Sequence, residues 1–95
     1  MEISNRLQKN LKRCQPWAAK HGIEAYRIYD RDIPEYPFIV DIYGEYVVLS
    51  DRREEIDFSE DKKHHFDDIK NAIRELVNPK EIIEKRRAPQ RQKSE

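Results

Sequence analysis

The first 22 residues carry apolar side chains three or four positions apart, which is the repeat of one face of an α-helix. This pattern predicts a helix over residues 3–21. Gly22 is expected to end it, because glycine adopts a left-handed conformation without steric cost. Pro16 removes one backbone donor inside the helix, so we expect a kink or a break near residues 12–16. The apolar positions are Ile3, Leu7, Leu11, Cys14, Trp17 and Ala18.

The next part of the chain is rich in the aromatic and β-branched residues that favour strands. It predicts one strand over 23–30, followed by a turn that Pro34 and Pro37 enforce through their fixed φ angles. Apolar and polar positions then suit an antiparallel hairpin over residues 38–50, with its tight turn at Gly44-Glu45.

A second helical repeat predicts a helix over residues 60–77. Ser59 is a good N-cap for it, and Pro79 follows its end. The apolar pair Ile82-Ile83 predicts a short final strand.

These elements predict an α+β fold of order α-β-β-β-α-β, with two helices on one face of a small antiparallel sheet of three or four strands. We expect one accessory domain over residues 1–85 and a flexible basic tail over 86–95. The sheet would be more complete with a further strand beyond residue 95, and an unfilled sheet edge would permit self-association. The expected core is Leu7, Leu11, Trp17, Ile23, Ile28, Phe38, Val40, Ile42, Val47, Leu49, Phe66, Ile69, Ile73 and Leu76.

Composition narrows the class of protein. The chain has 95 residues, of which 37% are hydrophobic and 40% charged, and its mean hydropathy is -1.06. It contains no apolar run of membrane-helix length and no apolar segment typical of a signal peptide, so we expect a cytoplasmic protein without a membrane partner. One cysteine excludes an intramolecular disulfide framework, and two glycines exclude a glycine-rich phosphate loop.

The net charge of zero conceals a strong asymmetry along the chain. Residues 1–22 carry a net charge of +4, residues 23–84 carry -8 and residues 85–95 carry +4. Basic ends of this kind suit a polyanion, although a basic helix face is also common as plain solvated surface. The candidate RNA-binding residues are Arg6, Lys9, Lys12, Arg13, Lys85, Arg86, Arg87, Arg91 and Lys93.

Two further groups are better explained by structure than by chemistry. His64 and His65 are adjacent rather than one helical turn apart, so we expect a solvated helix surface and no metal site. Cys14 lies on the apolar stripe with no predicted base nearby, so we expect a small buried hydrophobe rather than a nucleophile.

Asp30, Asp32 and Glu35 could hold a cation or act as acid and base, but carboxylates beside prolines more often cap turns. No nucleophile elbow, zinc-protease helix or dinucleotide fingerprint occurs. We therefore expect no catalytic, cofactor-binding or metal-binding residue on this chain.

A long ordered series of motifs carries a family resemblance. It comprises NRLQKNLK at 5–12, Trp-Ala at 17–18, GIEAYRIYDRDIPEY at 22–36, VDIYG at 40–44 and Val-Val at 47–48. The series resembles the segment that precedes the catalytic domain in the RlmK-like, guanine-N7-methylating half of the RlmKL-type 23S rRNA methyltransferases. A looser form occurs in the related RlmI-like cytosine methyltransferases. The step Arg-Gln-Lys at 91–93 resembles the one that leads towards the catalytic domain in that family.

The resemblance implies an accessory piece of an S-adenosylmethionine-dependent enzyme, whose cofactor loop and base pocket lie beyond residue 95. It places the basic side of the first helix near rRNA, and the turn after the first strand against the catalytic domain, in cis or in trans. Whether the chain itself counts as an enzyme stays open. The alternative is a stand-alone α+β protein-interaction module with an acidic central surface. The expected docking-turn residues are Tyr29, Asp30, Asp32, Pro34, Glu35 and Tyr36.

Overall fold

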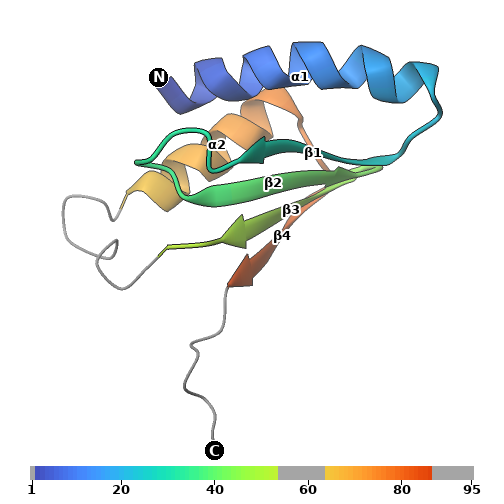
Figure 1. The fold of residues 1–95 in the computed structure, drawn as a ribbon. Coiled ribbons are helices and arrows are strands. Elements are labelled where there is room, and N and C mark those ends of the chain that lie inside the picture. The colour runs from blue at the N-terminus through green and yellow to red at the C-terminus, as the bar shows by residue number, and fades with distance from the viewer. Residues whose placement is uncertain (1, 54–63, 87–95) are drawn as a thin grey trace, which may run out of the picture.

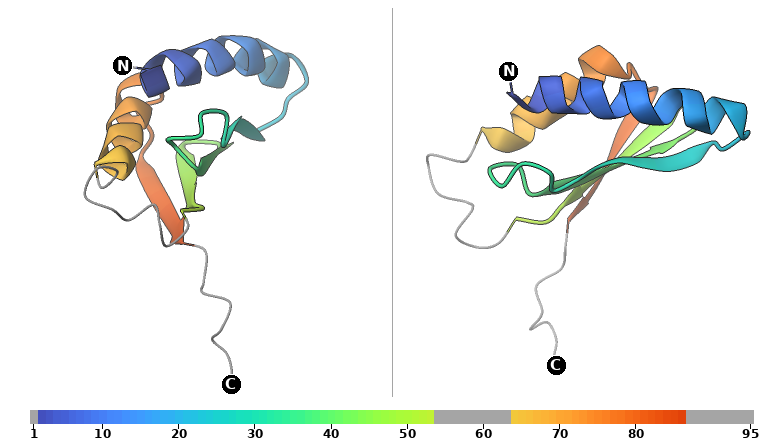
Figure 2. Two further views of the ribbon diagram at one scale, coloured as in Figure 1. Left: turned by 60° about the vertical axis from the view of Figure 1, so that its left-hand side comes forward. Right: turned by 45° about the horizontal axis from the view of Figure 1, so that its top comes forward.

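The computed structural model describes residues 2–53 and 64–86, which form two helices and a four-stranded sheet. Both helices lie on the same side of the sheet, so the described fold has two layers (Figures 1 and 2). The sheet order is β1-β2-β3-β4, and α1 packs against β1 and α2. The α+β class and the order α-β-β-β-α-β are confirmed. The elements are α1 (Glu2–Lys20), β1 (Ala25–Asp30), β2 (Phe38–Tyr43), β3 (Tyr46–Asp51), α2 (His65–Leu76) and β4 (Glu81–Arg86).

Helix α1 runs without interruption through Pro16, so the expected break is absent. Pro16 and Lys12 are both exposed, and the Lys12 carbonyl that loses its helical donor can bind water instead. At the other end Gly22 has φ +64°, its N–H donates to the Ala19 carbonyl, and the N–H of Ile23 donates to the Ala18 carbonyl. This pair of bonds is a Schellman motif, which confirms the predicted role of Gly22.

The hairpin of β2 and β3 follows the prediction. Tyr43 pairs with Tyr46 across a two-residue turn, in which Gly44 has φ +59°. Positive φ at the first central position is the requirement of a type II′ turn, and only glycine meets it without strain.

The sheet is mixed rather than purely antiparallel, which corrects one part of the prediction. Strand β4 pairs in parallel with β3, from Tyr46 beside Glu81 to Asp51 beside Arg86. A parallel neighbour requires a crossover long enough to span the sheet, and α2 lies between these two strands in the chain. The β-α-β order therefore predicts the parallel pairing that the sequence analysis missed.

The core lies between the helices and the sheet, and two expected members are wrong. Trp17 is exposed and Ile23 is only half-buried. A register shift between Arg27 and Tyr29 turns two consecutive residues, Ile28 and Tyr29, towards the core. The main core cluster is Ile3, Leu7, Leu11, Ile28, Tyr29, Ile33, Tyr36, Phe38, Val40, Ile42, Val47, Leu49, Ile69, Ala72 and Ile73, with Phe66 and Leu76 partly buried against it.

Helix α2 begins at His65 in the part of the chain that is described, and its C-cap is Val77. The expected first turn over 60–63 and the Ser59 cap lie outside the described residues. Asn78 adopts φ +52°, and Pro79 follows it, which accounts for the end of the helix. Of the two described helices, neither is long and apolar enough to cross a membrane.

Candidate nucleic-acid interface on helix α1

The outer side of α1 carries a line of cations. Lys9, Arg13 and Lys20 are exposed and recur at spacings of four and seven, so they lie along one side of the helix. Lys12 is exposed beside them, and Arg6 is half-buried at the border with the packed face. The structure thus brings together the helical half of the predicted RNA-binding set, with Lys20 as an addition.

Glu2 in the first turn is the one carboxylate on α1, because residues 3–23 contain neither Asp nor Glu. None of the α1 cations forms an ion pair within residues 2–53 and 64–86. Cations on the sheet and on α2 behave differently, because most are paired. These pairs are Arg27–Asp41, Arg31–Asp30, Arg53–Asp51, Arg86–Asp51, Lys70–Glu84 and Lys80–Glu45.

Trp17 joins this cationic line instead of the core. Trp17 is 52% exposed, whereas the neighbouring Ala18 is buried. Adjacent helical residues point about 100° apart, and here the small Ala18 is the one that packs against the core. Trp17 lies four residues after Arg13 and four before His21, and the two rings are 5.7 Å apart between centroids.

Sequence reasoning missed Trp17 because an apolar residue next to an apolar stripe is ordinarily assigned to the core. The signal that could have found it is its spacing of eight from Lys9 and four from Arg13. This spacing places the indole on the cationic side.

The two described residues of the second half of the predicted RNA-binding set, Lys85 and Arg86, lie elsewhere. Lys85 and Arg86 belong to β4, and β4 and β1 are the opposite edges of the sheet. Helix α1 packs over β1, so these two residues are not part of the α1 surface. Arg86 also pairs with Asp51 at 3.4 Å. The other predicted tail residues, Arg87, Arg91 and Lys93, lie outside the described residues, as does most of the predicted tail.

Asp51 is a buried carboxylate held by two arginines. Arg53 donates three hydrogen bonds of 2.6 to 3.1 Å to it, and the Arg53 side chain is only 6% exposed. The Arg53 guanidinium also lies 5.6 Å from the Phe38 ring centroid and 5.1 Å from that of Phe66. Burial raises the pKa of Asp51, but the bonds and charge of Arg53, with the charge of Arg86, outweigh burial and hold that pKa below its usual value. This cluster stabilises the fold.

The predicted docking turn is built around two inward-pointing tyrosines. Tyr29 Oη donates to the Tyr36 carbonyl at 2.7 Å and accepts from the Ile33 N–H at 3.1 Å. Both tyrosines are buried in the core of this fold, so they shape the turn from within. Burial is the main cause that raises the pKa of Tyr29 to about 12. Asp30, Asp32, Pro34 and Glu35 are exposed, and Asp30 pairs with Arg27 and Arg31.

Asp32 ties this turn to α1. It accepts a 3.3 Å bond from the Asp30 N–H and a 2.9 Å bond from the amide of Asn10. The same amide donates to the Ile28 carbonyl at 2.7 Å, and Asn10 is buried. The turn-capping role expected for these carboxylates is confirmed for Asp32.

His64 and His65 lie at the start of α2 and contact neighbouring side chains in the described residues. His64 is exposed, and His65 lies against Tyr36 with ring centroids 4.6 Å apart and planes tilted by 41°. Tyr36 Oη donates to Asp68 at 3.3 Å. Across the described ranges, no group of three His, Cys, Asp or Glu side chains is arranged to hold a metal ion. Cys14 is half-buried against the core, as a small hydrophobe would be.

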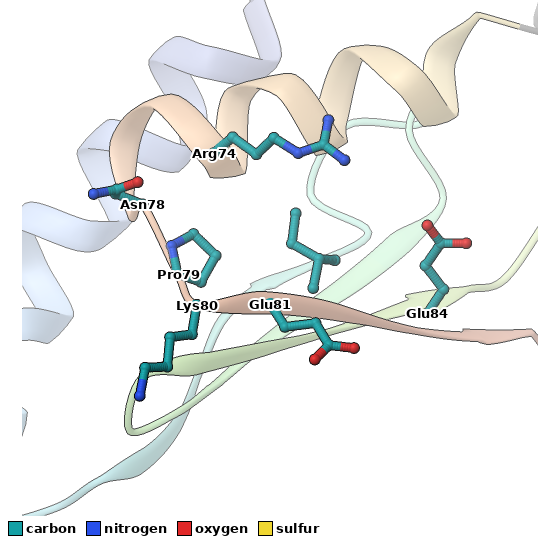
Figure 3. A pocket seen from close by; sticks show the side chains of 7 residues that line it. Arg74, Asn78, Pro79, Lys80, Glu81 and Glu84 are labelled. Carbon is teal, nitrogen blue, oxygen red and sulfur yellow. The ribbon is translucent and has the colours of Figure 1, made fainter.

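A shallow hollow of about 400 Å³ lies where α2 leads into β4, lined by Arg74, Asn78, Pro79, Lys80, Glu81, Ile82 and Glu84 (Figure 3). Three of its four charged side chains are already engaged. Arg74 donates to Asn71, Lys80 pairs with Glu45, and Glu84 pairs with Lys70. The hollow therefore has the shape of a pocket, but its side chains do not converge on one point as those of a catalytic or ligand-binding site do.

The chain is similar to the ribosomal RNA large subunit methyltransferase K/L of Psychromonas ingrahamii, with 38% identity over 78 residues. The match covers 81% of this chain, so the resemblance carried by its motifs is confirmed. The chain spans only about a tenth of the length of that curated relative, since the match covers 10% of it. No family model matches the chain.

Proposed function

We propose that this chain is the RNA-positioning segment of an S-adenosylmethionine-dependent large-subunit rRNA methyltransferase, and that it carries no methyl transfer itself. The cofactor and the reacting base belong to another part of such an enzyme. The outer side of α1 contacts the rRNA backbone, with Lys9, Lys12 and Arg13 facing phosphates. Arg6 lies at the border of this surface.

The observation that carries the proposal is the set of unpaired cations on α1. In a chain of zero net charge, most cations of the sheet have a carboxylate partner, whereas those of α1 have none among the described residues. Unpaired Lys and Arg in a line supply the counterion-releasing contacts on which RNA affinity depends. Similarity to an rRNA methyltransferase supports RNA as the polyanion.

The test is binding of the full chain to a labelled rRNA stem-loop at low salt, measured by fluorescence anisotropy. The variant Lys9→Gln/Lys12→Gln/Arg13→Gln is expected to bind at least tenfold more weakly. Its matched control, Arg52→Gln/Arg74→Gln/Lys80→Gln, removes the same charge from exposed sites away from α1 and is expected to bind like the parent chain. Equal weakening in both variants, or no binding by the parent chain, would contradict the proposal.

A docking role is the second candidate, and the open face of the sheet supports it. Tyr43, Tyr46 and Ile83 are exposed there, on the side that neither helix covers (Figure 2). Apolar side chains on a bare sheet face suit contact with another protein surface, such as the catalytic domain of the same enzyme. This role would survive a negative RNA result.

A further inference from the structure

Trp17 is the one tryptophan of the chain, and its exposure needs an explanation that charge alone does not give. An indole left half in water forgoes the burial that usually stabilises a tryptophan. The residues around it are Arg13 one turn before, and Lys20 and His21 one turn after. Phosphate binding would require Arg13 and Lys20 but no exposed indole.

The surroundings of the indole are those of a stacking platform. His21 lies against it with ring centroids 5.7 Å apart and planes tilted by 52°. Arg13 and Lys20 are exposed on the same side, and no acidic residue lies within the whole stretch 3–23. Aromatic rings that hold bases, flanked by cations that hold the backbone, are the arrangement by which proteins bind unpaired nucleotides.

The geometry also discriminates between kinds of RNA. In a duplex the base faces are covered by their neighbours, and the major groove of A-form RNA is too deep and narrow for side chains to read. An indole on the outside of a helix can therefore stack only on a base that is already unpaired. A duplex would meet the cations alone.

We propose that Trp17 stacks on one unpaired nucleobase while Arg13 and Lys20 contact the flanking phosphates. The site therefore prefers single-stranded or looped RNA over duplex. This inference rests on the proposed RNA contact of α1 and deepens it, because it names the kind of RNA that the surface takes.

The emission of Trp17 reports directly on the proposed contact, because no other tryptophan contributes. The full chain is titrated at low salt with a single-stranded oligoribonucleotide, and separately with a blunt RNA duplex of equal length. The single strand is expected to quench the indole strongly, and the duplex weakly. Equal quenching by both would overturn the preference.

Variants separate stacking from charge. Trp17→Ala is expected to weaken single-strand binding about tenfold or more, with less than a twofold change for the duplex, and Trp17→Phe to restore much of the loss. Tyr43→Ala is the matched control, because Tyr43 is 50% exposed on the open face of the sheet, and it should bind both RNAs like the parent chain. Circular dichroism verifies that each variant is folded.

Two failures are distinguishable. If Lys9→Gln/Lys12→Gln/Arg13→Gln weakens binding and Trp17→Ala does not, the α1 contact stands and the stacking inference is wrong. If neither substitution weakens binding, the proposed function fails with it, and Trp17 instead belongs to a protein-docking surface.

Discussion

The cations of α1 and the cations of the Asp51 cluster, formed by Asp51, Arg53 and Arg86, differ in what surrounds them. Arg53 is buried, donates to a buried carboxylate and lies over two aromatic rings. Lys9 and Arg13 are exposed and face no carboxylate in the part of the chain that is described. Burial and pairing commit Arg53 to folding, whereas solvent exposure without a partner leaves Lys9 and Arg13 available to a polyanion.

The contrast also explains how a chain of zero net charge can present a basic surface. Several carboxylates of the sheet pair with cations of the sheet or α2, as Asp41 does with Arg27 at 2.8 Å. The hydrogen bond and charge of Asp41 raise the pKa of Arg27 and hold it ionised. The negative excess of residues 23–84 offsets the two basic ends in the total, while the first 22 residues, and α1 with them, keep their net positive charge.

The largest stability loss is expected from breaking the buried cluster. Asp51→Asn removes the negative charge that Arg53 faces, and should lower the free energy of unfolding by about 3 kcal/mol in urea titrations. The pKa of Asp51 is lowered in the folded state, so its contribution is present above its unfolded pKa and is lost as acid protonates it. The parent chain should therefore lose more stability than Asp51→Asn between pH 5 and pH 2.5. If the parent chain and Asp51→Asn lost equal stability in acid, Asp51 would not be the cause of the acid sensitivity.

The buried phenol of Tyr29 gives the second largest effect. Its folded pKa of about 12 lies above the ordinary value of 10, so its contribution is complete below pH 10 and declines as pH rises from 10 to 12. The free energy of unfolding should fall by about 2 to 3 kcal/mol over this range. Urea unfolding at several alkaline pH values measures the decline. Tyr29→Phe should lack this decline and be less stable at neutral pH, because it leaves the Ile33 N–H unpaired. The same alkaline slope in both chains would contradict this assignment.

On α1 itself, substitutions on the inner side should lower the free energy of unfolding more than substitutions on the outer side. Asn10→Ala removes the donor to Ile28 and Asp32, and should cost about 1 to 3 kcal/mol of unfolding free energy. Thermal unfolding measures this loss. An unchanged melting temperature would show that the turn is held by Tyr29 alone.

The smallest stability effect is expected on the outer side. Lys9→Gln/Lys12→Gln/Arg13→Gln should change unfolding free energy by less than about 0.5 kcal/mol, because none of the three makes an ion pair in the described parts. A loss comparable with that of Asp51→Asn would erase the distinction between the two groups of cations.

Local patterns predicted the local structure well. The hairpin turn at Gly44, the stop at Gly22 and the final strand follow from backbone preferences that neighbouring residues carry themselves. The parallel pairing of β4 was missed because the direction of a strand depends on its crossover rather than on its own residues. Tertiary packing also carries α1 through Pro16, against the local preference for a break.

The sequence predicted the cations of the candidate site on α1 but not its tryptophan. Spacing placed Lys9 and Arg13 on one side of a helix, and the structure agrees. Trp17 was assigned to the core, because hydrophobicity alone cannot say which of two adjacent apolar residues faces inward. Lys85 could not be placed relative to α1 either, because only the sheet order sets β4 at the edge away from β1.

The most direct test of the central claim is the salt dependence of RNA binding. We predict that the logarithm of the affinity falls linearly with the logarithm of salt concentration. The slope should be shallower by roughly 2 in Lys9→Gln/Lys12→Gln/Arg13→Gln, since each lost phosphate contact to single-stranded RNA contributes about 0.7. The control variant Arg52→Gln/Arg74→Gln/Lys80→Gln should keep the slope of the parent chain. Identical slopes in all three proteins would contradict the claim that α1 binds RNA.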